Sequence, residues 1–385
     1  MSMLYEFYLL TDEGKRGSLI NGIVSLSVTF RFNEPARWTI NGSGLEECPL
    51  ADGVSLVVFR KSSPLFCGYA EKKVTEYDAK TRIYDWQVTG QSFLGKLAGR
   101  LVFPDPTDAT PDPDASYTAT GTLSKLMLDM IEDNAGADAL SARKLSGLVI
   151  PVQTPTGESL TVESKLDALL KFVQDELKDT DIQIRETWDL GTGTWAVMIG
   201  DPADVSDKVI FSVDNGSISK WERTVSEPKA NWLLVTGGPD ANDDTMSCIV
   251  YDAGSISKWG RIEGVVSRTD IKRNEDTSES WASVADRLEN AAYEELEKAS
   301  AQFGYKLTVT EINRNVFPDD YDIGSVVAVR IGADEFTAKV EEIRIEYSGG
   351  VETITPSVGT MQRGELQTVF AELGTLKEQI KVLQK

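Results

Sequence analysis

The sequence predicts a mainly β protein with an inserted α/β unit, an α+β fold that ends in an amphipathic helix. Three observations support this class. Near both ends, apolar and polar residues alternate with the two-residue period of half-buried strands. A central segment instead has the spacing of helices, and the last residues form a heptad pattern. The chain of 385 residues has room for about two or three domains.

Residues 1–105 are predicted to form an N-terminal β domain. Two alternating runs indicate half-buried strands: Leu26, Val28, Phe30 and Phe32, and later Tyr84, Trp86 and Val88. Between these runs, the continuous apolar segment from Val54 to Phe59 indicates a strand covered on both faces. The loop from Pro104 to Ala115, rich in Pro and Asp, marks the end of this domain by its composition.

Residues 106–204 are predicted to form an inserted α/β domain. Two apolar stripes have helical spacing: Leu123, Leu126, Met127, Met130 and Ile131, and then Leu166, Leu169, Leu170, Val173 and Leu177. Ser164, with Asp167 three residues later, is the expected cap of the second helix. Strands are expected at Ile182 and Ile184 and at Trp195, Val197 and Ile199, on either side of Gly191-Thr192-Gly193.

Residues 205–362 are predicted to form a second β domain that contains one helix. The helix has an apolar stripe made by Trp281, Val284, Leu288, Ala292 and Leu296. A final antiparallel pair of strands follows it. Phe336, Ala338 and Val340 alternate in one phase, and Ile343, Ile345 and Tyr347 alternate in the other. The change of phase at Glu341-Glu342 indicates a β-bulge, and Gly349-Gly350 indicates a tight turn.

A repeated hexapeptide lies within this second β domain. Gly216–Trp221 and Gly254–Trp259 both read Gly-Ser-Ile-Ser-Lys-Trp, and each copy follows residues rich in Asn and Asp. This pattern favours a turn that enters a strand. We therefore expect two equivalent strand entries, with similar surroundings for the two Ile and for the two Trp residues. These residue types at this spacing form no recognised chemical site.

Residues 363–385 are predicted to form a coiled-coil helix that makes an oligomer interface. Its heptad places Leu366, Leu373 and Ile380 at a, and Val369, Leu376 and Leu383 at d. Glu372 at g and Lys377 at the following e favour parallel, in-register helices. Gly364 and Gly374 each cost about 1 kcal/mol relative to Ala, so the helix needs either a partner chain or a docking surface. The alternative is a single helix packed on its own domain, and leucine-rich core positions leave dimer and trimer open.

The composition excludes several classes of function. The 61 acidic and 39 basic residues give a net charge of −22, which opposes sequence-specific binding of nucleic acid. The chain has no histidine, which excludes Ser-His-Asp triads, Cys-His pairs and histidine metal sites. Cys48, Cys67 and Cys248 are too widely spaced for a metal knuckle or a disulfide framework, and buried thiols are expected.

Two acidic loops are the candidates for a metal site, namely Pro104–Ala115 and the run Asp240, Asn242, Asp243 and Asp244. Carboxylates are suitable calcium ligands, but the spacing matches no known calcium loop and the prolines oppose wrapping an ion. Solvated loops without a metal are therefore expected. The first ten residues lack the pattern of a signal peptide, and no apolar run is long enough to span a membrane. Synthesis and folding in a cytoplasm are expected, without stable membrane insertion.

A set of short motifs resembles the tail-hub proteins, or minor tail proteins, of siphoviruses that infect actinobacteria. In chain order the motifs are Arg31–Pro35, Asp85–Gly90, Leu101–Pro104, Ile210–Ser212 with Gly216–Ile218, Ser226–Gly238, Ser257–Glu263, Asp320–Val327 and Thr353–Gly359. Each motif alone is weak, and their common order over most of residues 1–360 carries the resemblance.

The resemblance implies a structural protein of the phage tail tip, similar to the baseplate hub of contractile tails. Such proteins form a trimeric ring in which each chain supplies two β-barrel-like domains. The ring joins the tail tube and the distal tail protein to the tip and lets the genome pass. The expected partners are further copies of the chain, the distal tail protein, the tape-measure protein and tip or fibre proteins. The expected location is the virion, and the resemblance supplies no catalytic, cofactor or metal residue.

Two other functions remain open on the sequence alone. A cell-wall hydrolase could use a pair of carboxylates, since acidic residues are abundant. A tail protein that binds glycans of the host surface could use some of the eight tryptophans, although tryptophans in cores or interfaces are the stronger explanation of that number.

Overall fold

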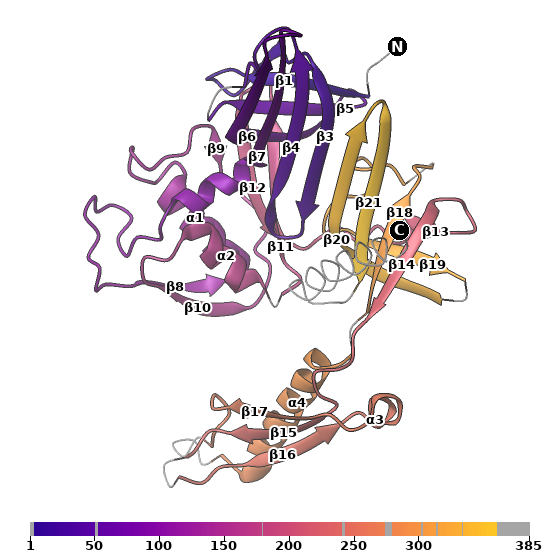
Figure 1. Ribbon diagram of the computed structural model, residues 1–385. Coiled ribbons are helices and arrows are strands. Elements are labelled where there is room, and N and C mark those ends of the chain that lie inside the picture. The colour runs from indigo at the N-terminus through magenta and orange to yellow at the C-terminus, as the bar shows by residue number, and fades with distance from the viewer. Residues whose placement is uncertain are drawn as a thin grey trace. The chain divides into compact units, whose positions relative to one another are not determined.

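The computed structural model describes residues 4–359, apart from 51–52, 179, 241–242, 274–278, 302, 313–314 and 333. The chain is mainly β, with several open sheets and few helices (Figure 1). It divides into two compact units. The first contains residues up to 221 together with 306–358, and the second contains residues 222–305. The second unit thus lies inside the range 205–362 that the sequence analysis assigned to one domain, and the heptad residues 363–385 lie outside the described residues.

One sheet of 13 strands forms most of the first unit. Its strands follow the order β14-β18-β21-β20-β3-β4-β7-β6-β5-β1-β2. Off this path, β19 pairs with β20, and β13 pairs with β19. The N-terminal strands are β1 Tyr5–Leu10, β2 Arg16–Leu19, β3 Ile23–Arg31, β4 Glu34–Gly44, β5 Ser55–Arg60, β6 Ser63–Asp78 and β7 Ile83–Ser92. The later strands are β13 Ile210–Ser212, β14 Ile218–Val225, β18 Phe303–Val309, β19 Val326–Ile331, β20 Asp334–Ser348 and β21 Val351–Gly359.

The large sheet curls strongly, and the curl brings strands that are far apart in its order into side-chain contact. The rings of Tyr5 on β1 and Tyr347 on β20 lie 4.8 Å apart. Within the curl, Phe30 of β3 packs against Phe66 of β6 with ring centroids 6.2 Å apart. Among the described strands, the hydrogen-bonded order stays open at both ends. The curl is therefore completed by side chains, and a barrel closed by hydrogen bonds is not confirmed.

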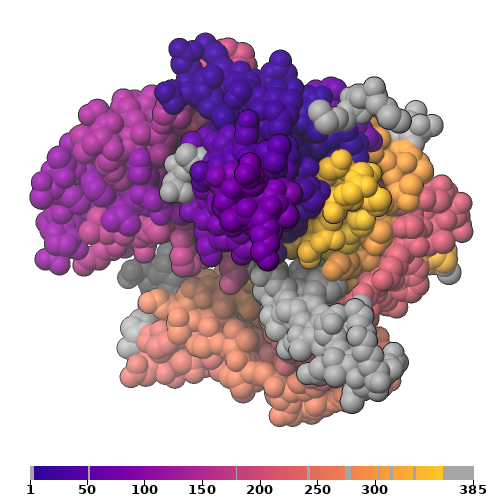
Figure 2. Space-filling model, turned by 45° about the horizontal axis from the view of Figure 1, so that its top comes forward, coloured from indigo at the N-terminus to yellow at the C-terminus, as the bar shows by residue number. Residues whose placement is uncertain are grey.

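The N-terminal strand predictions are confirmed. Leu26 and Val28 on β3 are fully buried, as is Val88 on β7. The run on β5 is buried on both faces for a clear reason. Val57 and Phe59 belong to the core of the inserted α/β segment, while the alternate residues Leu56 and Val58 face the other way. Figure 2 shows the indigo N-terminal surface adjoining the magenta α/β segment.

The inserted segment contains both predicted helices and two small sheets. Its helices are the 3₁₀ helix η1 Phe93–Gly99, α1 Leu123–Ala135 and α2 Leu169–Leu177. Its strands are β8 Tyr117–Thr122, β9 Leu148–Val149, β10 Ser159–Ser164, β11 Gln183–Asp189 and β12 Thr194–Gly200. The predicted strands on either side of Gly191-Thr192-Gly193 are confirmed as β11 and β12, and they pair antiparallel from Gln183–Gly200 to Asp189–Thr194. One core holds α1, α2 and β12 together.

The expected cap of the second helix is wrong. Ser164 ends β10, Leu166 has a positive φ of 56°, and α2 begins only at Leu169. The hydroxyl of Ser164 donates instead to the carboxylate of Asp167 at 2.9 Å. The pair that resembled a capping box therefore stabilises a turn between a strand and a helix. The helix is held by its apolar face, where Leu169 and Val173 are fully buried.

The second unit is a three-stranded sheet with one long helix on one face. Its elements are β15 Trp232–Gly237, β16 Ser247–Tyr251, α3 Ala253–Trp259, β17 Glu263–Arg268 and α4 Trp281–Lys298 (Figure 1). The central strand β15 pairs antiparallel with β16 and parallel with β17. The predicted helix is confirmed as α4, which begins at the cap Ser280. Its apolar stripe packs on Leu233, Val235 and Val250 of the sheet.

The prediction that the repeated hexapeptide forms two equivalent strand entries is wrong. The first copy enters strand β14, where Ile218 is buried and Trp221 is 46% exposed. The second copy forms helix α3, which has no buried residue. Asp252 caps this helix, because its carboxylate accepts from the Ser255 N–H at 3.0 Å. The same six residues adopt two structures because their surroundings differ, so the repeat gives no support to a duplicated unit.

The final hairpin is confirmed. Gly349 and Gly350 both have positive φ, as a tight turn between β20 and β21 requires. The predicted change of phase within β20 coincides with a change of partner. Residues 334–339 of β20 pair with β19, and residues 342–348 pair with β3. The two halves of this strand therefore belong to different parts of the curled sheet.

Candidate functional site

A cavity of about 340 Å³ lies in the first unit, where three segments of the chain meet. The N-terminal sheet contributes Phe30, Arg31 and Glu34, while η1 contributes Leu94. Strand β11 and the loop before β19 complete the wall, with Ile184, Arg185, Glu186, Thr187, Trp188, Phe317, Pro318, Asp322 and Ile323. The cavity is large enough for a small molecule or a side chain of a partner.

Glu186 is an acid of raised pKa in this wall. Burial raises the pKa of its carboxyl to about 7, although the Ser92 hydroxyl, the Leu94 N–H and the charge of Lys96 oppose the rise. One carboxylate oxygen accepts from the Leu94 N–H at 2.7 Å. The ammonium of Lys96 lies over the Phe93 ring, 4.0 Å from its centroid. A carboxyl that titrates near neutrality can act as a general acid or base.

The other carboxylates of the wall are already engaged. Glu34 lies 3.7 Å from the guanidinium of Arg31, which also holds Glu342 at 2.7 Å. The Asp322 carboxylate accepts from the N–H of Ile323 at 2.7 Å. Burial raises the pKa of Asp322 as well, against that bond from Ile323. The cavity thus presents two acids of raised pKa, Glu186 and Asp322, beside the ion-paired Glu34. This arrangement supports a hydrolytic carboxylate pair only weakly.

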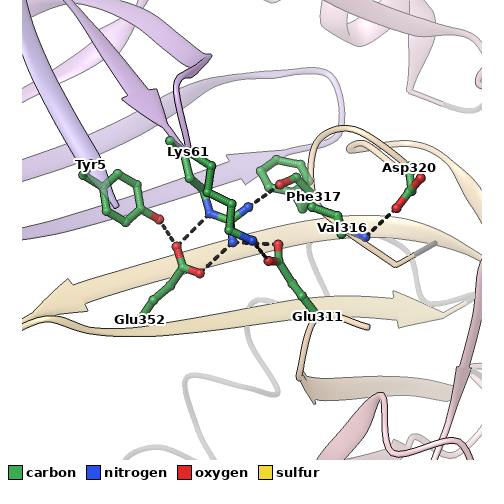
Figure 3. Close-up of polar contacts among 8 residues, drawn as sticks. Tyr5, Lys61, Glu311, Val316, Phe317, Asp320 and Glu352 are labelled. Carbon is green, nitrogen blue, oxygen red and sulfur yellow. Dashed lines mark hydrogen bonds and ion pairs between the residues drawn. The ribbon is translucent and has the colours of Figure 1, made fainter. Parts of the chain in front are cut away.

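A buried cluster of charges joins strands β1 and β5 to strand β21 (Figure 3). We call Tyr5, Arg60, Lys61, Glu311 and Glu352 the Arg60 cluster. Arg60 ends β5, and its side chain is 2% exposed. Its guanidinium binds Glu352 of β21 in a bidentate manner, with N–O distances of 2.7 Å from Nε and 2.6 Å from Nη2. The same Nη2 lies 2.6 Å from Glu311 Oε1.

Further groups complete the Arg60 cluster. The Tyr5 hydroxyl donates to Glu352, Lys61 donates to Glu311, and Nη1 of Arg60 donates to the carbonyl of Phe317. The loop that presents this carbonyl is held by Asp320, whose carboxylate accepts from the Val316 N–H at 2.9 Å (Figure 3). Every edge of the guanidinium is therefore satisfied, as a buried cation requires.

Burial and pairing compete within this cluster. Burial raises the pKa of Glu352, but hydrogen bonds from Arg60 and Tyr5 outweigh burial and hold that pKa below its usual value. Burial also raises the pKa of Tyr5, and its bond to Glu352 adds to the rise. At neutral pH, the Glu352 carboxylate thus faces Arg60, while Tyr5 remains a neutral donor. The cluster fastens strands that are not neighbours in the order of the sheet.

The acidic loops show no metal geometry. In the first loop, Asp105, Asp108 and Asp112 each accept a hydrogen bond from the backbone N–H two residues later. Each carboxylate therefore stabilises its own turn. Among the described residues, no group of three or more Cys, Asp or Glu is placed to hold a metal ion.

The expectation of a solvated tip for the second loop is wrong in one respect. Asp240 is 8% exposed, and its carboxylate accepts from the Asp244 N–H at 3.0 Å. Asn242 lies outside the described residues.

The remaining candidates have simple surroundings. Cys48 and Cys67 are buried free thiols, while Cys248 is half-buried. Three of the tryptophans, Trp38, Trp86 and Trp195, are core residues. No helix of the described residues is long and apolar enough to cross a membrane. The predicted interface residues Leu366, Val369, Leu373, Leu376, Ile380 and Leu383 lie outside the described residues.

Sequence reasoning missed the Arg60 cluster and Glu186. A weak signal was present for Arg60, since it directly follows a run of residues buried on both faces of β5. A charged residue in that position needs a buried partner. Its partners are 251 and 292 positions away in sequence, so the sequence alone could not identify them.

Solved structures with a similar fold cover nearly the whole chain. The 43 kDa tail protein of prophage MuSo2 from Shewanella oneidensis has a TM-score of 0.58 at 13% identity, over 92% of this chain and 97% of that one. A tail protein from Neisseria meningitidis has a TM-score of 0.59 at 9% identity, over 92% and 96%. Prophage tail protein gp18 from Listeria monocytogenes has a TM-score of 0.54 at 10% identity, over 97% and 99%.

These identities establish a shared fold alone. No curated protein matches the chain at a significant level. A family model, described as the Siphovirus ReqiPepy6 Gp37-like protein, matches residues 6–360. That range holds each motif on which the resemblance in the sequence was based and covers nearly the whole chain, which therefore belongs to the Siphovirus ReqiPepy6 Gp37-like family.

Proposed function

We propose that the chain is a structural protein of a siphovirus tail tip, a hub that joins the tail tube and distal tail protein to the tip. One observation carries this proposal. The fold matches three tail proteins, two of them from prophages, over more than nine-tenths of this chain and of each of theirs. A match of that extent agrees with membership of a siphovirus family.

The construction of the large sheet supports a structural role. A protein that joins two parts of a tail would need a β scaffold that resists opening. The Arg60 cluster fastens β5 to β21 across the curl, and the Tyr5–Tyr347 contact does the same beside it. In the proposed hub, this curled sheet acts as a barrel-like domain that is completed by side chains.

The hub is proposed to be a homotrimer. Two β domains in each of three chains would match the sixfold symmetry of a tail tube, and closed rings are the usual form of homo-oligomers. The heptad residues from Leu366 to Leu383 would form a parallel coiled coil on the threefold axis. The proposed partners are the distal tail protein, the tape-measure protein and tip or fibre proteins. The net charge of −22 suits a channel that DNA crosses without binding.

Purified virions test the proposed location. Particles of a phage that encodes the chain are labelled with gold-conjugated antibody against the second unit, residues 222–305, and their proteins are identified by mass spectrometry. The proposal expects gold at the distal end of the tail, and tailless or non-infectious particles when the gene carries a stop codon. Absence of the chain from washed virions would contradict the proposal, whereas a monomer in solution would not, because the ring can assemble on the tail.

A second candidate is a cell-wall hydrolase, favoured only by Glu186 and its pKa of about 7 beside a cavity. This reading predicts that the purified chain releases soluble fragments from peptidoglycan and that Glu186→Gln abolishes the release. Glu71→Gln, at an exposed glutamate of β6, is the matched control. If the unaltered chain releases no soluble fragments from peptidoglycan, it is not a cell-wall hydrolase.

A further inference from the structure

The sheet of the second unit has one covered face and one bare face. Leu233, Val235 and Val250 point toward α4 and are almost fully buried. The alternate residues of the same strands point the other way, and several are strongly exposed, namely Ile249 at 54%, Tyr251 at 59% and Val265 at 73%. Trp232 and Leu234 lie half-buried on this second face.

The pairing registers place these side chains in a compact array. Leu234 on β15 lies opposite Ile249 on β16 and opposite Val265 on β17. Trp232 lies one pleat further along, opposite Tyr251 and Glu263. We call these six residues the open face. Glu263 is its one charged member. Arg261 pairs with Glu263 at 2.7 Å and also lies over the Trp232 ring, 4.3 Å from its centroid. So few charges, together with Trp and Tyr, are typical of the centre of an interface.

Two features indicate that a helix should cover the open face. The first is composition. A solvated sheet face is normally polar, whereas Ile249, Tyr251 and Val265 make this exposed face apolar. The second is the other face, where the single helix α4, of 18 residues, covers the three strands with one apolar stripe. A helix about 10 Å wide spans roughly the width of three strands.

The chain contains one further amphipathic segment that suits this face. Residues 363–385 have the stripe from Leu366 to Leu383, which is about as long as α4. Arg363, Lys377, Lys381 and Lys385 outnumber Glu365, Glu372 and Glu378 there, in a chain whose net charge is −22. The segment is thus mildly basic, whereas residues 222–305 carry more acidic than basic groups. Gly364 and Gly374 weaken it as an isolated helix, so it needs a surface to fold on.

We propose that in the unassembled chain the segment 363–385 docks as a helix on the open face of its own second unit. The same stripe cannot pack on this sheet and form a coiled coil at the same time. A segment tethered to its site has an effective concentration in the millimolar range, about a thousandfold above a micromolar concentration of free chains. Docking within one chain is therefore favoured over self-association until assembly of the tail raises the local concentration of chains. Only this release on assembly rests on the proposed trimeric hub.

Hydrogen exchange of the full-length chain tests the docking. At a chain concentration where light scattering shows a monomer, amides within 363–385 should exchange at least about tenfold more slowly than an unstructured peptide of the same sequence. Val265→Glu should remove this protection, because it buries an unpaired charge under the docked helix. Val351→Glu is the matched control, since Val351 is also strongly exposed, at 69%, but lies on β21 of the first unit. It should leave the protection unchanged.

Each other outcome overturns the proposal. Unprotected amides in the monomer show that the segment does not dock. Protection that survives Val265→Glu shows that it packs elsewhere. Protection that appears only as the chain associates assigns the stripe to a second copy. These results leave the location in the virion untouched, so failure of the docking and failure of the tail-hub function can be told apart.

Discussion

Replacing Arg60 by methionine should destabilise the first unit by about 3–5 kcal/mol at pH 7. The change removes the cation and leaves Glu311 and Glu352, which are 15% and 14% exposed, facing each other without a charged partner other than Lys61. Breaking a buried ion pair from one side costs about this much, because the remaining carboxylates stay desolvated. For a unit of this size, the loss corresponds to a fall in Tm of roughly 6–15 °C.

The pH dependence provides a second test of the same reasoning. The folded pKa of Glu352 lies below its usual value, so the stability that its carboxylate contributes is present at neutral pH and is lost as the pH falls through the folded pKa. In Arg60→Met the carboxylates gain little from being charged. The difference in unfolding free energy between variant and unaltered chain should therefore shrink below about pH 4.

Chemical unfolding followed by far-UV circular dichroism measures both effects. The matched control is Arg344→Met, whose ion pair with Glu346 is 2.6 Å long but half-exposed, and which should cost less than about 1 kcal/mol. Adding Glu352→Gln to Arg60→Met should recover part of the loss. If Arg60→Met unfolds within 1 kcal/mol of the unaltered chain at pH 7, as the control does, the cluster does not fasten the sheet and the reasoning fails.

Three more substitutions test other parts of the structure. Glu186→Gln should stabilise the chain by about 2 kcal/mol at pH 8 but hardly at pH 4.5. The folded pKa of Glu186 is raised to about 7, so the stability that the protonated acid contributes is lost as the pH rises through 7. Equal shifts in thermal melts at the two pH values would show that burial of this acid is unimportant. Gly90→Ala should cost more than about 3 kcal/mol, since a Cβ there would meet a β6 backbone oxygen at 2.0 Å and the Trp38 ring at 2.4 Å. The control is Gly99→Ala, where a Cβ meets nothing within 4 Å, and equal melting temperatures of the two variants would contradict the prediction. Asn231→Ala should cost about 2 kcal/mol and speed hydrogen exchange in the connection from α3 to β17, which the buried Asn231 amide holds through two bonds of 2.7 Å; unchanged exchange there would show that the connection holds itself.

Local periodicity predicted most of the elements but not their pairing. The stripes of α1 and α4 and the alternation in β3 and β7 were readable because each element exposes one face and buries the other. The order of the large sheet was not readable, since β20 pairs with β3 across more than 300 residues. Those contacts depend on topology, which leaves no local pattern in the sequence.

Two failures show how surroundings override local preference. The hexapeptide is a strand at Ile218 and a helix at Ile256, because the first copy joins a sheet edge while Asp252 caps the second. Ser164 and Asp167 have the spacing of a capping box, yet a strand already occupies Ser164. The site followed the same rule. Arg60 could be recognised as unusual from its own neighbours, but Glu311 and Glu352 could not be identified as its partners.

A reconstruction of the tail tip by electron cryo-microscopy, without imposed symmetry, would show directly whether the chain is a hub. Three copies of this chain are expected in one ring at the distal end of the tail tube, with the curled sheets of the first units arranged around the channel. A tail tip that lacks the chain, or that holds it as single peripheral copies outside the ring, would rule out the proposed hub.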